Sequence, residues 1–173
     1  MRGAAILLTG FLLLALLSPL LHDAGVANYV PDVALVICLY VGLTTPLEKA
    51  IGMALVLGLL KDGFTTGQAV GLAMEVSVLA VLLSARLSRR LVLRGPVGAM
   101  VLAFGASLFS SLIEIVLSLL FVRLFTEGAS GPGLIAGAML PQALVTAPFG
   151  AMLFWLLDRL DALTTRKNES VFL

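Results

Sequence analysis

Two carboxylic acids interrupt long apolar stretches of this 173-residue chain. Glu75 lies within residues 65–85 and Glu114 within residues 96–122. An ionisable side chain inside a membrane costs about 2.5–3.5 kcal/mol on insertion scales, so each carboxyl must be neutral, paired or in contact with water. Two interpretations follow. Either the two carboxyls form a protonated pair or bond to serines and to Gln142, or they line a cavity that handles a ligand or a proton.

The residues of known enzyme sites are absent from the sequence. His22 is the single histidine and lies at the edge of an apolar segment, so no Ser–His–Asp set can form. Cys38 is the single cysteine, which excludes an internal disulfide and a multi-cysteine metal site. No glycine-rich phosphate loop is present. We expect a protein that is not an enzyme, with no catalytic residue, no metal and no cofactor.

The composition predicts an integral membrane protein. Hydrophobic residues make up 60% of the chain and charged residues only 12%, about half the charged share of a typical soluble domain. In water such a chain would expose large apolar patches. The formal net charge is +1, so nothing indicates nucleic-acid binding.

The apolar segments predict a single all-α domain, a six-helix transmembrane bundle. The expected spans are residues 3–21, 32–46, 50–61, 65–85, 96–122 and 133–157, followed by a cytoplasmic tail at 158–173. The second and third are short for a bilayer that needs about 20 residues per helix. They are either two short spans in a thinned membrane or a re-entrant pair.

The basic residues predict the orientation of the bundle. Of eleven Lys and Arg residues, all but Lys61 and Arg123 fall on one side if the six segments span the membrane. Both termini are then cytoplasmic. The loop with Arg86, Arg89 and Arg90 is an orientation signal, a contact for anionic membrane lipid or a docking site for a partner.

Small residues recur at helical spacing. Gly67 and Gly71 precede Glu75 at intervals of four, and Gly133 and Gly137 repeat in the last segment. Such faces let helices approach closely in a membrane. They pack within the chain, or one of them docks a helix from another protein.

The middle of the chain resembles the MreD family of bacterial rod-shape-determining proteins. The resemblance begins at Pro31-Asp32 and is strongest from Gly52 to Asp62, which ends in Gly58-Leu-Leu-Lys-Asp62 and is followed by Gly67 and Gly71. Glu75 is not part of that pattern. The resemblance implies that Gly58 and Asp62 fix the outer end of the third segment, and Pro31-Asp32 the start of the second.

The family resemblance also implies a function. MreD-like proteins are inner-membrane scaffolds of the complex that directs lateral peptidoglycan synthesis. The implied partners are MreC directly, and the actin-like MreB and the peptidoglycan polymerase and transpeptidase pair indirectly. The family is similar in fold to the substrate-binding S-components of energy-coupling vitamin importers. A small-molecule-binding S-component is therefore the alternative.

Overall fold

The computed structural model shows an all-α protein of six helices and describes residues 2–23, 30–64, 71–88, 95–124 and 132–169. The helices are α1 (Arg2–Asp23), α2 (Val33–Thr44), α3 (Leu47–Phe64), α4 (Leu72–Ser88), α5 (Pro96–Leu124) and α6 (Pro132–Glu169). The predicted all-α class and the six helices are confirmed.

Local sequence explains where the helices begin. The Asp32 carboxylate accepts a hydrogen bond from the backbone N–H of Leu35 at 3.0 Å and so caps α2. Pro96 and Pro132 occupy the first positions of α5 and α6, where a proline lacks only an N–H that the helix does not use. Gly71, directly before α4, has a φ of +99° that favours glycine.

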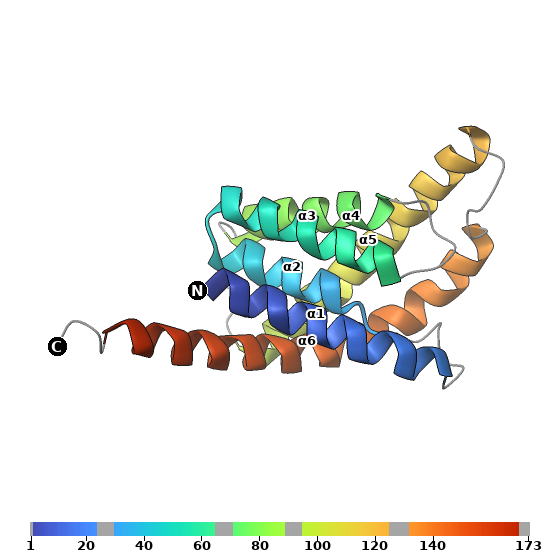
Figure 1. Ribbon diagram of the computed structural model, residues 1–173. Helices are drawn as coiled ribbons and strands as arrows, with labels where there is room; N and C mark the ends of the chain where they lie inside the picture. Colours follow the sequence, from blue (N-terminus) through green and yellow to red (C-terminus); the bar gives the residue numbers. More distant parts are fainter. Residues whose placement is uncertain (1, 24–29, 65–70, 89–94, 125–131, 170–173) are drawn as a thin grey trace.

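Successive helices run in opposite directions, so the bundle has two ends (Figure 1). One end, which we call the inner end, holds Arg2, the turn between α2 and α3 and the last residues of α4. The other, the outer end, holds the starts of α2 and α4. The turn of the α2–α3 hairpin thus lies at the inner end, and α5 and α6 extend past the hairpin at the outer end (Figure 1).

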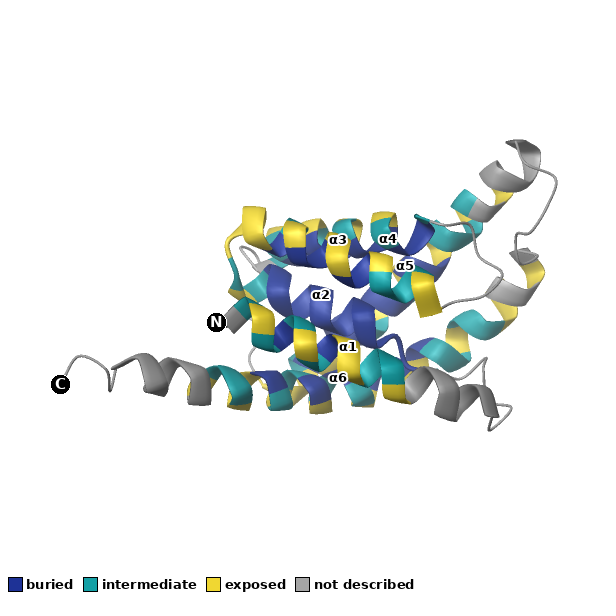
Figure 2. Cartoon of the chain, viewed as in Figure 1, coloured by how far each residue is buried: buried dark blue, intermediate teal, exposed yellow. Residues whose placement is uncertain are grey.

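Helix α2 lies at the centre of the fold. Every residue from Val33 to Gly42 is buried, and α2 contacts each of the other five helices. Figure 2 shows it as a dark blue core within a mixed shell. A helix that is apolar on all sides belongs in such a position, because no face of it gains from contact with water.

Three glycines allow close helix contacts around this core. A Cβ added at Gly58 of α3 would lie 2.5 Å from the Met74 Cα of α4, and one at Gly42 of α2 would overlap the Ser84 hydroxyl of α4. A Cβ at Gly150 of α6 would lie 2.5 Å from the Cβ of Ala103 in α5. A larger residue at any of these positions must push two helices apart.

The ends of two helices differ from the expected segments. Helix α6 continues to Glu169, although we placed the end of the last helix at 157, and its final turns extend past the bundle (Figure 1). The residues after the apolar run are polar but include no proline or glycine, so the helix does not end where the apolar run ends. They include Thr164, Thr165, Arg166 and Lys167. Helix α4 is described from Leu72, and residues 65–70 lie outside the described part.

Two stretches of the described chain are long and apolar enough to cross a membrane. They are Pro96–Leu117 in α5, with 22 residues, and Ala136–Ala162 in α6, with 27 residues. Gly3–Leu16 and Val33–Thr44 are shorter apolar helical stretches. Length and composition alone therefore support membrane crossing for α5 and α6.

Candidate functional site

An ion pair lies at the outer end of the hairpin formed by α2 and α3. The Lys61 ammonium in the last turn of α3 lies 2.7 Å from a carboxylate oxygen of Asp32, which caps α2. The side chain of Asp32 is 4% exposed and that of Lys61 is 19% exposed. A charge-assisted hydrogen bond of this length is among the stronger polar contacts in proteins.

Two further helices reach the same pair. Glu114 of α5 places a carboxylate oxygen 4.0 Å from the Lys61 ammonium, and its side chain is 14% exposed. The Thr146 hydroxyl of α6, which is fully buried, accepts a hydrogen bond from the backbone N–H of Asp32 at 3.2 Å. We call Asp32, Lys61, Glu114 and Thr146 the ionic cluster. It joins four helices at one point.

The ionic cluster is suited to hold helices together, which we call a structural clamp. Within it, two carboxylates share one ammonium group, and each acidic residue comes from a different helix than the lysine. Breaking a buried pair leaves an uncompensated charge, so such a cluster strongly selects one arrangement of its helices. Across the described ranges, no three His, Cys, Asp or Glu side chains gather closely enough to hold a metal ion.

Asp62, next to Lys61, holds the start of α4. One of its carboxylate oxygens accepts a hydrogen bond from the backbone N–H of Gly71 at 2.9 Å, and the other accepts one from the N–H of Ala73 at 3.1 Å. These are N–H groups that the helix itself leaves unpaired. Asp62 therefore links α3 to α4 by capping, at the same end of the bundle as the ionic cluster.

The structure brings together several of the residues that the sequence singled out. Pro31 is buried directly before Asp32, and Gly58 lies against the backbone of α4. Arg86 is exposed near the inner end of α4. Three other candidates, Gly67, Arg89 and Arg90, lie outside the described residues.

Glu75 and Glu114 do not occupy a common site. Glu75 is exposed in the first turn of α4, whereas Glu114 faces Lys61. The predicted pairing of the two carboxyls with each other is therefore wrong. Glu75 follows Leu72 and Ala73, which are buried, and its helical position turns it away from the core.

Sequence reasoning missed Lys61 and Thr146. Lys61 was treated as a loop residue that flanks a span, yet it follows the buried residues Ala54, Leu57 and Gly58 at intervals of seven, four and three. That spacing places it on the buried face of α3 and could have identified it. Thr146 carries no such signal, because nothing in the sequence shows which face of α6 meets α2.

A second polar contact lies toward the inner end. The Tyr40 hydroxyl of α2 donates to carboxylate oxygens of Asp158, at 3.0 Å, and Asp161, at 2.9 Å, both in α6. The Tyr40 ring also packs edge-on against Phe154, with centroids 5.4 Å apart. Nearby, the Arg159 guanidinium lies 6.0 Å from the centroid of the Trp155 ring. The contacts of Tyr40 with Asp158, Asp161 and Phe154 fix α6 to the end of α2.

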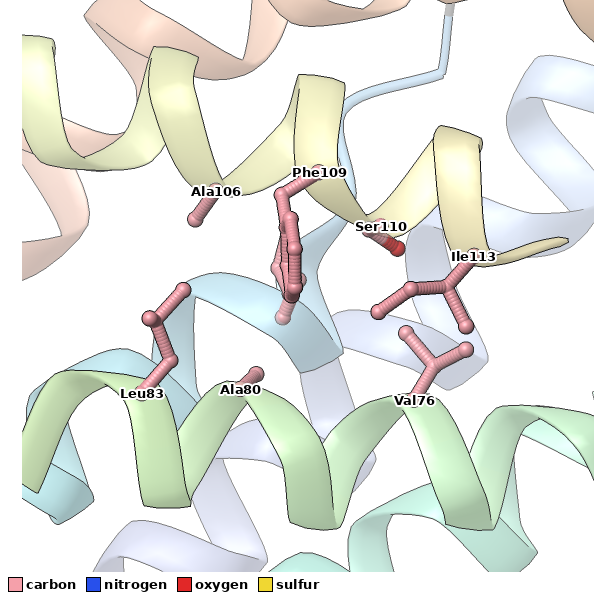
Figure 3. Close-up of a pocket in the computed structure, with 8 residues that line it drawn as sticks. Val76, Ala80, Leu83, Ala106, Phe109, Ser110 and Ile113 are labelled. Atoms are coloured by element: carbon pink, nitrogen blue, oxygen red, sulfur yellow. The ribbon is translucent and has the colours of Figure 1, made fainter.

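A small cavity separates α4 from α5 (Figure 3). Its volume is about 10 Å³, and its lining includes Leu35 of α2, Val76 and Ala80 of α4, and Ala106 and Phe109 of α5. A space of this size holds about one water molecule at most. This cavity therefore has no room for a vitamin-sized ligand.

Comparison with known proteins adds no assignment to this geometry. No protein-family model matches the chain, and neither the curated proteins nor the solved structures contain a significant match to it.

Proposed function

We propose that this chain is a multi-pass protein of the bacterial inner membrane and acts there as an MreD-like scaffold. The observation that carries the membrane placement is the inverted distribution of polarity. The buried polar residues of the described chain include Asp32, Ser77, Ser84, Ser107, Ser110, Ser111 and Thr146, while large apolar side chains from every helix except α2 are exposed. Lipid, unlike water, solvates such an exterior.

The exposed apolar side chains support α1, α3, α4, α5 and α6 as membrane segments. They include Leu12 of α1, Leu59 of α3, Leu82 of α4, Leu112 of α5 and Leu144 of α6. Helix α2 is enclosed by the others and needs no lipid contact. In this proposal α2 and α3, with 12 and 18 residues, are two short spans.

The aromatic and charged residues support an orientation. Trp155 and Arg159 lie next to one another near the inner end, where tryptophan and arginine commonly mark a membrane interface. Arg2, Lys49 and Arg86 belong to the same end of the bundle. In our proposal this end is cytoplasmic, and so are both termini.

A scaffold needs a rigid fold but no ligand-binding cavity. The contacts inside the bundle therefore favour a scaffold over an S-component. The ionic cluster clamps α2, α3, α5 and α6, and Asp62 clamps α4. The cavity between α4 and α5 is too small for a vitamin. The residues that resemble the MreD family, Pro31-Asp32, Gly58 and Asp62, lie at or beside these clamps.

The partner surface that we favour is on α6. Gly133 and Gly137 are exposed, and a Cβ added at either would meet nothing within 4 Å. Glycines four residues apart form a face against which a second transmembrane helix packs closely. In this proposal the single membrane helix of MreC docks there.

Co-purification tests the proposal. The chain is co-expressed with tagged MreC from the same organism and extracted in detergent, with an unrelated single-span protein as the control for non-specific capture. Gly137→Leu would fill the α6 face and is expected to remove most of the captured chain. Gly52→Leu is the matched control, because Gly52 of α3 is also exposed with nothing within 4 Å of an added Cβ.

The outcomes separate the two functions. Stoichiometric capture that Gly137→Leu weakens and Gly52→Leu does not weaken supports the scaffold and its α6 surface. If MreC captures both variants as well as it captures the unmodified chain, the scaffold function is supported but the α6 surface is refuted. No capture of a folded, monodisperse chain refutes the scaffold and directs the work to small-molecule binding by an S-component-like protein.

A further inference from the structure

Helix α4 exposes a short apolar stripe that is bounded by a charged residue at each end. Up to Leu87, the exposed residues of α4 are Glu75, Leu79, Leu82 and Arg86. Their intervals of four, three and four residues place them on one face of the helix. Glu75 and Arg86 lie roughly 16 Å apart along the helix axis. The apolar part of this face is therefore much shorter than the hydrocarbon core of a bilayer, which is about 30 Å thick.

Helix α3, which packs against α4, is limited in the same way. Lys49 is exposed near its inner end, and Asp62 caps α4 at its outer end. These two charged residues are separated by about 20 Å of helix. The large exposed side chains between them are apolar and include Leu55, Val56 and Leu59. We call the exposed faces of α3 and α4 together the short flank.

Helix α5 presents a longer apolar face to its surroundings. Val97, Val101 and Val116 are exposed along it. Its apolar stretch Pro96–Leu117 has 22 residues and covers about 33 Å of helix. The charged residue in that stretch, Glu114, belongs to the ionic cluster. Because α5 and α6 extend past the α2–α3 hairpin at the outer end (Figure 1), the short flank lacks apolar surface on its outer side.

The short flank cannot match an ordinary bilayer by changing its inclination. A tilted helix covers less of the membrane thickness than its own length, so tilt increases the mismatch. Arg86 can extend its long side chain toward the inner membrane surface. With that reach, the flank matches a hydrocarbon layer of about 20 Å, which is roughly 10 Å thinner than usual. A bilayer adapts to such a surface by becoming thinner beside it.

A second copy of the chain fits the short flank less well than lipid does. Copies inserted in the same orientation carry Glu75 at one depth and Arg86 at another. Two α4 stripes in contact would therefore place like charges near one another at both ends, which is unfavourable. Only Leu79 and Leu82 of each α4 would contribute apolar contact between them. Lipid headgroups, in contrast, accommodate both charges.

We propose that the short flank binds a locally thinned outer leaflet and selects phospholipids with short acyl chains. The spacing of the charges at the two ends of the flank identifies this partner. The inference rests on the membrane placement proposed above and is independent of binding to MreC. It also assigns a role to Glu75, which has no part in the ionic cluster. In this proposal Glu75 sets the outer limit of the lipid-facing surface of α4.

Competition between lipids at a tryptophan probe tests the short flank. Trp155 is the single tryptophan of the chain, so Trp155→Phe provides a background without tryptophan. In it, Leu79→Trp places a probe on the short flank and Val101→Trp places one on α5. Both positions are exposed. They lie at similar distances from the inner end, about 8–11 Å along their helices from Arg86 and Pro96.

The readout is the relative binding of short and long phospholipids at each probe. Each variant is reconstituted in brominated phosphatidylcholine with eighteen-carbon chains, mixed with unbrominated phosphatidylcholine whose chains have fourteen or eighteen carbons. Bromine quenches tryptophan at contact, so displacement of the brominated lipid restores the fluorescence. At position 79 we expect a preference of about twofold for the fourteen-carbon lipid. At position 101 we expect no preference for it.

Two glutamates provide the variant and its matched control. Glu75 and Glu48 are both exposed and both lie in the first turn of a helix. Glu75 is at the outer end, whereas Glu48 is at the inner end beside Lys49. Glu75→Leu removes the outer charge of the α4 stripe, so the preference at position 79 should fall to that at position 101. Glu48→Leu leaves both ends of the α4 stripe unchanged and should leave the preference at position 79 intact.

Four results would overturn the proposal. Equal preferences at the two probes would mean that the flank does not select lipids by length. A preference at position 79 that survives Glu75→Leu would mean that Glu75 does not limit the apolar surface. Quenching at position 101 without quenching at position 79 would mean that protein, such as a second copy, covers the flank. Absence of quenching at both positions would refute the membrane placement itself, a failure that co-purification with MreC does not report.

Discussion

Removing the ammonium group of Lys61 should destabilise the fold more than any other single change in the ionic cluster. Lys61→Met keeps the length and apolar stem of the side chain and removes its charge. It leaves Asp32, whose side chain is 4% exposed, without its partner at 2.7 Å. Removing one partner of a buried ion pair costs about 3–5 kcal/mol. Because Lys61 is 19% exposed, we expect about 3 kcal/mol, the lower end of that range.

Two further variants isolate the charge from the shape. Asp32→Asn combined with Lys61→Met removes both charges, and asparagine still caps α2 through its side-chain oxygen. We expect this double variant to recover most of the lost stability, because no buried charge remains unpaired. Glu114→Gln should cost about 1 kcal/mol or less, since its oxygen lies 4.0 Å from the lysine, beyond hydrogen-bonding distance.

The chain contains its own reporter of unfolding. Cys38 is the single cysteine and is fully buried in α2, so a thiol-reactive fluorophore labels it only when the core opens. For a domain of this size, 1 kcal/mol corresponds to about 2–4 °C in Tm. Lys61→Met should therefore lower the Tm in detergent by about 6–12 °C. A shift below about 2 °C, or a double variant no more stable than Lys61→Met alone, would refute the ion-pair reasoning.

Substitutions at three other contacts test the rest of the fold. Asp62→Ala removes the cap of α4 and should cost about 1–2 kcal/mol, measured by the same Cys38 labelling, whereas Asp62→Asn should retain part of the capping. Gly58→Ala should destabilise by about 1–3 kcal/mol because its Cβ meets the α4 backbone. Gly52→Ala, in open space on the same helix, should be neutral or stabilising by up to about 1 kcal/mol, and an equal effect at both glycines would contradict the close approach. Tyr40→Phe keeps the contact with Phe154 but loses the bonds to α6, so hydrogen exchange should rise in the α6 segment around Asp158 and remain unchanged in α3.

The helices could be predicted because their signals are local. Apolar runs and their charged or proline-containing borders predicted all six helices. The roles of Asp32 and Asp62 at helix ends were implied by the family resemblance, and Asp62 caps the start of α4 rather than the end of α3. The length of α6 was not predicted, because the apolar run ends near Leu157 while the helix continues to Glu169. The length of an apolar run predicts only the part of a helix that packs in the bundle or faces lipid. It does not predict a polar extension of the helix past the bundle.

The ionic cluster was predicted only in part, because pairing between helices is not a local property. Glu114 was identified because a charge inside an apolar segment is unfavourable, but the partners considered for it were Glu75, serines and Gln142. The true partner, Lys61, lies on the buried face of α3. Lys61 and Glu114 come close because α3 and α5 both pack against α2. The sequence alone does not show how these helices pack against one another.

The complete enclosure of α2 has a consequence for how the protein is made. In the proposed membrane, α2 is inserted long before α5 and α6 have been synthesised, so it must first stand among lipids that it will not touch in the finished fold. Because residues Val33 to Val41 are mostly apolar, lipid can solvate α2 on all sides until the later helices have been inserted. The final position of α2 then depends on the last helix to arrive, because Thr146 and Asp158, which bind the two ends of α2, both belong to α6. The packing around α2 is therefore complete only after α6 has been synthesised. In a chain that stops after α5, α2 would lack the contacts that α6 makes with it.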